Sequence, residues 1–148
     1  MSASIMPVIG TIARRSRTLR AEDIVLFTEI SGDRNPLHYD AALAEDSRFG
    51  GIIVQGGVTT ALLNAIVAED LPGPGTVFLH VDWSFRAPAR PGDTITAEVE
   101  VTDARLDKPI ATLRTTITNQ AGTTLVEGHA VVYRDPTIAE HQPRKERT

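Results

Sequence analysis

The sequence predicts an α+β domain in which a curved antiparallel sheet wraps around one long central helix. Two observations carry this prediction. Apolar residues recur at helical spacing over Val58–Glu69, a segment that is apolar almost all round, which is typical of a helix enclosed by other structure. Four strand-like segments then follow along the chain with short turns between them, and such a run forms an antiparallel sheet.

The composition limits the class of protein. The 148 residues suit a single domain, and the absence of cysteine excludes disulfide scaffolds, thiolate metal sites and cysteine nucleophiles. A net charge of −4 argues against a nucleic-acid partner, because backbone binding needs a basic face. No apolar stretch approaches the roughly 20 residues of a membrane span, and no secretory signal is recognisable. We therefore expect a cytoplasmic protein with neither a membrane nor a nucleic-acid partner.

Two elements are predicted before the first motif. Met6–Ala13 is predicted as a short edge strand, because Pro7 cannot donate a hydrogen bond to a neighbouring strand. Arg20–Ile30 is predicted as a helix with Glu22 and Asp23 in its first turn, where the helix dipole favours acidic side chains. The basic residues between these two elements are expected to form a connection.

The next segment is predicted to be irregular. Asp33–His38 is expected to form a loop, because Pro36 disfavours helical geometry at the residue before it. Asp40 is then placed to cap a short helix over Ala41–Glu45 through its carboxylate.

Turn residues separate the strands that follow the central helix. Apolar and polar residues alternate over Thr94–Val101, as they do in a strand with one buried face. The predicted strands are Thr76–Phe85, Thr94–Val101, Ile110–Asn119 and Thr123–Tyr133. We expect one domain over residues 1–134 and a polar C-terminal tail over residues 135–148.

The first candidate site is a carboxylate and an imidazole, Asp33 and His38, in the predicted loop. A bend at Asn35 and Pro36 lets both side chains point into one pocket. The imidazole titrates near neutral pH, and the carboxylate can hold a water molecule or accept its proton, so the pair suits general acid–base catalysis. The alternative is an ordinary turn with a surface histidine, since Asp, Asn and Pro are common turn residues.

The second candidate site lies at the start of the central helix. Gly56 and Gly57 leave backbone amides exposed there, which suits an oxyanion or another anion, and tight packing is the alternative.

Asn64 is the one strongly polar residue of the helix and is expected to be buried, so it needs either a structural hydrogen bond or a ligand as partner. His80 and His129 are more typical of histidines packed in a sheet, and no metal site is expected because no cluster has zinc-ligand spacing.

Several segments resemble one enzyme family. The segments are Phe27–His38, Phe49–Gly57, Leu71–Thr76, Phe85–Pro88 and Pro91–Asp93. They are similar to the hydratase motif and its flanking turns in the MaoC-like dehydratases, especially the (R)-specific enoyl-CoA hydratases. The resemblance covers residues 15–134, and the Asp-x-Asn-Pro-x-His core at 33–38 is its most specific part.

The resemblance implies a hot-dog fold, which is a curved sheet around a long helix, and a homodimer with substrate tunnels near the subunit interface. A larger assembly is the alternative to the dimer. It implies reversible syn hydration of trans-2-enoyl-CoA to (R)-3-hydroxyacyl-CoA, with the CoA thioester as substrate and no cofactor. Asp33 and His38 would activate one water molecule, and the Gly56 amide would bind the thioester oxygen. Asn35 would shape the loop, and Asn64 falls where several relatives carry a small polar residue near the site.

The chain departs from this pattern at one place. Relatives usually carry His-Gly-Met where this chain has Gln55, Gly56 and Gly57. Gln55 and Gly57 are therefore expected to alter the wall of the acyl pocket, and the small Gly57 to admit a bulkier acyl group. The phosphates of CoA need cationic partners, and the candidates are Arg48, Arg86, Arg90 and Lys108, each of which is otherwise ordinary surface charge.

The sequence leaves three alternatives to an enoyl-CoA hydratase. One is a specialised dehydratase that acts on another acyl thioester, and another is a non-catalytic acyl-CoA-binding subunit. The third is a hot-dog thioesterase, which the sequence disfavours because the carboxylates of the central helix, Glu69 and Asp70, lie at its far end.

Overall fold

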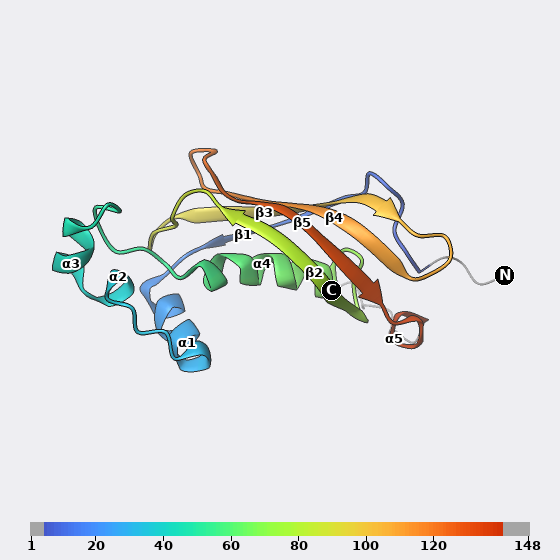
Figure 1. The fold of residues 1–148 in the computed structure, drawn as a ribbon, viewed down its shortest axis with the longest axis horizontal. Coiled ribbons are helices and arrows are strands. Elements are labelled where there is room, and N and C mark those ends of the chain that lie inside the picture. Colours follow the sequence, from blue (N-terminus) through green and yellow to red (C-terminus); the bar gives the residue numbers. More distant parts are fainter. Residues whose placement is uncertain (1–4, 141–148) are drawn as a thin grey trace, which may run out of the picture.

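The strands form one sheet that covers one long helix. The structure, a computed structural model, describes residues 5–140. Its five strands pair in the order β1-β3-β4-β5-β2, each antiparallel to its neighbour, and α4 (Gly56–Glu69) lies against one face (Figure 1). The strands are β1 (Ile12–Thr18), β2 (Thr76–Phe85), β3 (Thr94–Ala104), β4 (Ile110–Thr118) and β5 (Thr124–Arg134). The predicted α+β architecture and its four later strands are confirmed.

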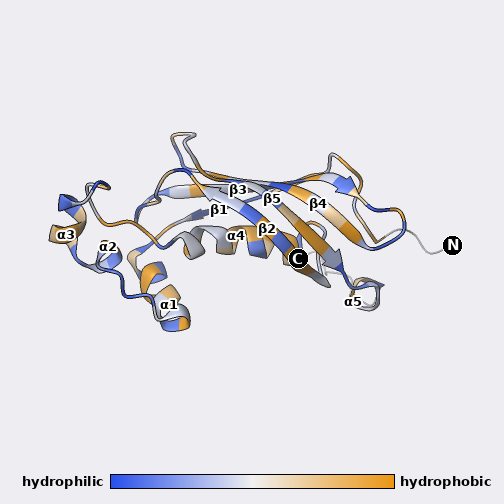
Figure 2. Ribbon diagram, in the orientation of Figure 1, coloured by the Kyte–Doolittle hydropathy of each residue, from blue (hydrophilic) through white to orange (hydrophobic). Residues whose placement is uncertain are grey.

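The core lies between α4 and the inner face of the sheet. The alternation predicted over residues 94–101 is confirmed, because Ile95, Ala97, Val99 and Val101 are all fully buried. Leu63 and Ile66 of α4 are also fully buried in the same cluster. Polar residues take the outer face, and Figure 2 shows the resulting mixture of hydrophilic and hydrophobic positions along the strands.

Three helices extend beyond one end of the sheet and carry the first motif (Figure 1). They are α1 (Ala21–Ser31), α2 (Pro36–Tyr39) and α3 (Ala41–Asp46). The predicted helices at 20–30 and 41–45 match α1 and α3 closely. The cap at Asp40 is confirmed, because its carboxylate accepts a hydrogen bond from the Leu43 N–H at 3.1 Å.

Strand β1 begins later than predicted. It covers Ile12–Thr18 instead of residues 6–13, so the arginines expected in a connection lie inside the strand. Their charges are compatible with a strand at the sheet edge because each guanidinium reaches a carboxylate. The pairs are Arg14 with Glu98 at 2.7 Å, Arg15 with Asp70 at 2.6 Å, and Arg17 with Asp23 at 2.5 Å.

Helix α4 is covered on one side only. Its buried residues, Thr59, Leu63, Ile66 and Val67, face the core, whereas Ala61 and Asn64 are exposed. The prediction of a helix enclosed on all sides is therefore wrong for a single chain. An apolar outer face gives the same sequence pattern whether the same chain or another molecule covers it.

The C-terminal region begins with structure that the predicted tail did not include. Residues Pro136–Glu140 form α5, and the Asp135 N–H donates a hydrogen bond to the Gly75 carbonyl at 2.8 Å. The rest of the predicted tail, residues 141–148, lies outside the described residues. Within residues 5–140, no helix has the length and apolar character needed to cross a membrane.

Candidate active site

The first candidate residues lie where α1 passes into α2. Helix α1 ends at Ser31 and is capped by Gly32, whose φ of 78° lies in the left-handed region that glycine adopts without strain. Helix α2 begins at Pro36, so His38 lies on a short helix and not in the predicted loop. Proline suits the first helical position because an amide hydrogen there would have no helical partner. Asn35 caps this helix by accepting a hydrogen bond from the Leu37 N–H at 3.1 Å.

Asp33 and His38 face each other across this turn. Nε2 of His38 lies 3.6 Å from Oδ2 of Asp33, which is beyond a direct hydrogen bond. The other carboxylate oxygen, Oδ1, accepts a hydrogen bond from the Asn35 N–H at 3.0 Å. The His38 side chain is 8% exposed and the Asp33 side chain 36% exposed. The chain therefore brings the pair together as the spacing predicts, with a separation that one water molecule can bridge.

A backbone carbonyl sets the orientation of the His38 ring. Nδ1 lies 2.7 Å from the carbonyl oxygen of Ile53. Because a carbonyl only accepts, we assign the hydrogen to Nδ1, and Nε2 of the neutral ring is then an acceptor. Nε2 and the Asp33 carboxylate both require a donor between them. A water molecule can donate one hydrogen to each, which leaves its oxygen free to attack a carbon atom.

A buried threonine that the sequence reasoning missed connects the elements around this pair. Thr28 is 5% exposed, and its hydroxyl lies 2.8 Å from the Asp33 carbonyl oxygen and also contacts the Tyr39 hydroxyl. The amide Nε2 of Gln55 lies 3.4 Å from the same hydroxyl and donates to the Ile24 carbonyl at 3.0 Å. Thr28 follows Ile24 by one helical turn, so its place on the apolar side of α1 is the signal that could have revealed it.

Gln55 and Gly57 pack against α1 and do not form an open pocket wall. Gln55 is 2% exposed, and its Oε1 has no hydrogen-bond partner among the described residues. A Cβ atom at Gly57 would collide with the ring of Phe27. The expectation that Gly57 makes room for a bulkier acyl group is therefore wrong, because the Phe27 ring already fills that space.

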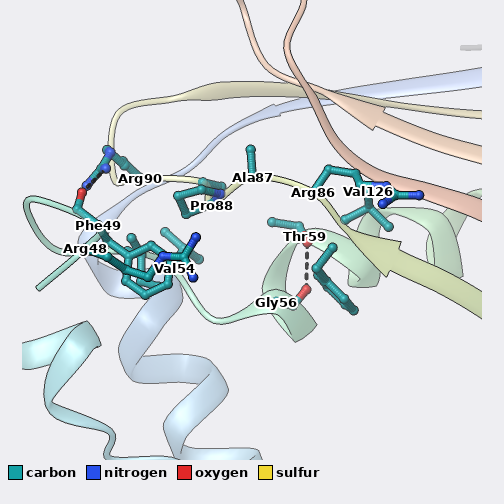
Figure 3. Close-up of a pocket in the computed structure, with 13 residues that line it drawn as sticks. Arg48, Phe49, Val54, Gly56, Thr59, Arg86, Ala87, Pro88, Arg90 and Val126 are labelled. Carbon is teal, nitrogen blue, oxygen red and sulfur yellow. Dashed lines mark hydrogen bonds between the residues drawn. The ribbon is translucent and has the colours of Figure 1, made fainter.

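Gly56 borders a cavity of about 540 Å³ beside the start of α4 (Figure 3). Thr59 also lines this cavity, and its hydroxyl donates a hydrogen bond to the Gly56 carbonyl at 2.7 Å. A Cβ atom at Gly56 would lie 2.7 Å from Cε1 of Phe85, so the position has no room for a side chain. The same close packing brings the first turn of α4 to the edge of the cavity.

The Asp33–His38 pair and the cavity meet at Ile53. Asp33 and His38 are not among the residues that line the cavity, whereas Ile53 is. The carbonyl of Ile53 holds the His38 ring, so one residue connects the two parts of the site. The structure thus places Asp33, Asn35 and His38 together on the α1–α2 side, and Gly56 on the cavity side.

The remaining candidates lie outside this arrangement. Asn64 is exposed on the outer side of α4, so its expected burial is wrong. His80 and His129 lie on neighbouring strands with ring centres 6.2 Å apart, and both are exposed, so they belong to the sheet surface and not to the core. Among residues 5–140, no group of three potential ligands is arranged to hold a metal ion.

Two further sequence-based expectations concern charge. Of the four basic residues considered for phosphate binding, Arg48, Arg86 and Arg90 line the cavity and Lys108 does not.

Asp70, at the far end of α4, forms an ion pair with Arg15 at 2.6 Å. A carboxylate held in this way is poorly placed for catalysis, which further disfavours a thioesterase.

The chemistry of the pair defines the class of protein. A water molecule held between Asp33 and His38 can add to a carbon–carbon double bond, or form again from the corresponding alcohol. This chemistry, on a curved sheet that covers a long helix, is that of a hot-dog hydro-lyase.

The chain belongs to the MaoC-like family, because the family model described as MaoC like domain matches residues 9–124. An (R)-specific enoyl-CoA hydratase of Aeromonas caviae is 44% identical over 132 residues, which are 89% of this chain and 98% of the relative. An (R)-specific enoyl-CoA hydratase of Rhodospirillum rubrum is 37% identical over 123 residues, which are 83% of this chain and 85% of the relative. The MaoC-like family that the sequence resemblance indicated is confirmed.

A solved structure supports the fold. The (R)-hydratase from A. caviae involved in PHA biosynthesis matches with a TM-score of 0.83 and 42% identity, over 87% of this chain and 98% of the other. The hot-dog fold expected from the resemblance is therefore confirmed.

Proposed function

We propose that the protein catalyses the reversible hydration of trans-2-enoyl-CoA to (R)-3-hydroxyacyl-CoA. The observation that carries the proposal is the Asp33–His38 pair, 3.6 Å apart, in a chain 44% identical to a protein named (R)-specific enoyl-CoA hydratase. The reaction needs water and groups that transfer protons, and the pair supplies the latter. No cofactor is required, because the CoA thioester is itself the substrate.

Hydration proceeds by addition of water across the double bond. The water oxygen attacks C3 of the enoyl thioester while the Asp33–His38 pair takes one of its protons. The electrons of the double bond move toward the thioester carbonyl, and the pair returns a proton to C2 on the same face. The product gains a hydroxyl at C3 and a hydrogen at C2, and dehydration is the reverse sequence.

The Gly56 amide would stabilise the negative charge that develops on the thioester oxygen. It lies at the start of α4, where backbone N–H groups and the helix dipole favour negative charge. A single donor of this kind contributes roughly 3–4 kcal/mol to the transition state. Gly56 also lines the cavity, so the amide lies beside the space that a ligand would enter.

Asn35 would act as a positioning residue for the catalytic carboxylate. Its backbone N–H holds Oδ1 of Asp33 at 3.0 Å, which leaves Oδ2 directed to His38. Its side chain caps α2, the helix that carries His38. One residue therefore fixes both members of the pair.

The test of the proposed function is hydration of crotonyl-CoA, followed by the loss of enoyl-thioester absorbance. An (R)-specific dehydrogenase coupled to the reaction assigns the chirality of the product. We expect turnover to the (R)-3-hydroxy product. Formation of the (S)-product, or no turnover with crotonyl-CoA and with longer or branched enoyl-CoA substrates, would contradict the proposal. The second result would favour a dehydratase of another thioester or a binding subunit.

We also propose that the protein forms a homodimer through β2. The two edge strands of the sheet differ in character: β1 carries arginines bound in ion pairs, whereas β2 carries exposed apolar residues. These are Val77, Leu79, Val81 and Phe85, which are 54%, 55%, 43% and 59% exposed. An apolar edge strand with free backbone groups favours pairing with another strand. The exposed outer side of α4 is a second surface that a partner chain can cover.

A further inference from the structure

The cavity beside Gly56 has a positive charge that contrasts with the rest of the protein. Three of its lining residues are arginines, Arg48, Arg86 and Arg90, and none of the described residues that line it is acidic. The whole chain has a net charge of −4. A concave site lined by one sign of charge concentrates ligands of the opposite sign. The cavity, with a volume of about 540 Å³, therefore suits an anionic group.

Arg48 is the cation most available to such a group. It is exposed, and within the described part of the chain its guanidinium forms neither an ion pair nor a hydrogen bond. Its Cζ lies 5.7 Å from the centre of the Phe49 ring. This cation–π contact keeps the guanidinium beside the cavity without neutralising its charge. All of its N–H donors remain free for a ligand.

The other two arginines differ in their partners. The guanidinium of Arg90 donates hydrogen bonds to main-chain carbonyls, those of Ile52 and Phe49, which fix its position and do not cancel its charge. Arg86 forms an ion pair with Glu127 at 2.9 Å and is thereby largely neutralised. In the view of Figure 3, Arg48 and Arg90 lie at one end of the cavity and Arg86 at the other. The end near Arg48 and Arg90 is therefore the more positive.

We propose that this end of the cavity binds a phosphate group of the carrier that bears the acyl thioester. The inference rests on the proposed function, which places the thioester oxygen at the Gly56 amide. From there the carrier runs through the cavity to Arg48 and Arg90. A guanidinium binds phosphate oxygens through paired, charge-assisted hydrogen bonds. Arg48 makes the principal contact, and Arg90 supplies a fixed positive charge.

A phosphate near a thioester can come from two sources. One is the nucleotide part of CoA, and the other is the single phosphate at the end of a 4′-phosphopantetheine arm. Three crotonyl thioesters separate these sources. The CoA thioester carries the phosphates of the nucleotide and of the arm. The 4′-phosphopantetheine thioester carries only the phosphate of the arm, and the N-acetylcysteamine thioester carries none.

The experiment is steady-state hydration of the three thioesters by the parent and by variants at Arg48. We expect Arg48→Ala to raise KM for crotonyl-CoA roughly tenfold with kcat unchanged. Its kcat/KM for the N-acetylcysteamine thioester should match that of the parent, because that substrate has no phosphate. Arg48→Lys should recover part of the loss, because it restores the charge without the paired donors. An increase in KM for the 4′-phosphopantetheine thioester as well would assign the contact to the phosphate of the arm.

A matched control removes one positive charge elsewhere. Lys108 lies in the turn between β3 and β4 and does not line the cavity, so Lys108→Ala should leave all three substrates at parental values. A parental KM for crotonyl-CoA in Arg48→Ala would overturn the phosphate site. An equal loss with all three thioesters would overturn it as well, since the effect would then not depend on phosphate.

Binding of free CoA, measured by calorimetry, separates this inference from the proposed function. We expect the parent to bind CoA, and Arg48→Ala to bind it roughly tenfold more weakly. Such binding in a protein that hydrates no enoyl thioester would contradict the hydratase function and leave the phosphate site in place. Hydration by a parent whose CoA binding does not depend on Arg48 would contradict the phosphate site alone.

Discussion

The ring of Phe27 on α1 occupies the space where a side chain at Gly57 on α4 would lie. This contact is the reason that position 57 needs a glycine. The backbone conformation does not need one, because the φ of Gly57 lies outside the left-handed region. Gly57 is next to Gly56, whose amide we assign to the thioester oxygen. The contact therefore joins α1, the helix that precedes Asp33, to α4, the helix that begins at Gly56.

The first prediction concerns this contact. Gly57→Met should lower the free energy of unfolding by about 1–3 kcal/mol, because the Phe27 ring must move aside. The double variant Phe27→Ala/Gly57→Met should lose less than the sum of the single variants, since the methionine then fills the space that the ring leaves. Urea unfolding of all three variants measures these values. Additive losses would show that the two positions do not compete for space.

The second prediction concerns the buried hydroxyl of Thr28. Thr28→Val keeps the shape of the side chain but removes the hydrogen bonds to the Asp33 carbonyl and the Tyr39 hydroxyl. We expect kcat to fall roughly ten- to hundredfold with KM little changed, because the Asp33 carboxylate, which we propose to be catalytic, loses its position while the cavity does not change. Thr28→Ser, which retains the hydroxyl, should recover most of the activity. A parental kcat in Thr28→Val would remove this residue from the positioning network.

The third prediction uses the partly buried ion pair of Arg17 and Asp23, which joins β1 to α1. Asp23 is 5% exposed, and its carboxylate lies 2.5 Å from Arg17 and accepts the Arg20 N–H at 3.0 Å. Burial acts to raise the pKa of Asp23, but the hydrogen bonds from Arg17 and Arg20 together with their charges outweigh it and hold the pKa below its usual value. The folded state therefore favours the ionised carboxylate.

This shift gives a stability difference with a defined dependence on pH. A lowered pKa stabilises the fold above the carboxyl pKa of the unfolded chain, near 3.9, and the contribution is lost as the pH falls through the folded value. At pH 7, Asp23→Asn should therefore be less stable than the parent by about 1–3 kcal/mol. The difference should shrink as the pH falls below about 4. Thermal unfolding across this range measures it, and a difference that stays constant with pH would contradict the ion pair as its cause.

The fourth prediction tests the proposed dimer. Leu79 is 55% exposed on β2, so Leu79→Lys would place a charge from each copy at a shared β2 edge. We expect the parent to have twice the mass of one chain in light scattering and the variant to be monomeric or weakly associated. Lys108→Ala serves as a control that changes charge away from this edge. A parent that is monomeric would contradict the proposal, as would a variant that remains fully dimeric.

The sequence predicts most of the fold because its patterns are local. The central helix and the strand over residues 94–101 follow from helical spacing and strict alternation, and both are confirmed. The position of β1 could not be predicted in this way, since its arginines are stabilised by carboxylates from distant segments, such as Glu98 and Asp70. The exposure of the outer face of α4 could not be predicted either, because apolar composition does not show which molecule covers a surface.

The site was predictable only where its residues are close in the sequence. Asp33, Asn35 and His38 fall within one turn, so their spacing alone brings them together. The contact of Phe27 with Gly57 depends instead on how two helices pack, and no pattern in either helix contains that information. The Ile53 carbonyl that orients His38 was hidden for the same reason, because every residue has a carbonyl and only the fold selects one.

The central claim is that Asp33 and His38 together activate the water molecule, and one measurement tests it most directly. The turnover of crotonyl-CoA is compared in the parent, Asp33→Asn and His38→Ala, after circular dichroism has confirmed that each variant is folded. We expect each substitution to lower kcat by roughly 10²–10⁴-fold, the usual contribution of a positioned acid–base group. A folded variant with turnover close to that of the parent would contradict the claim for the residue replaced.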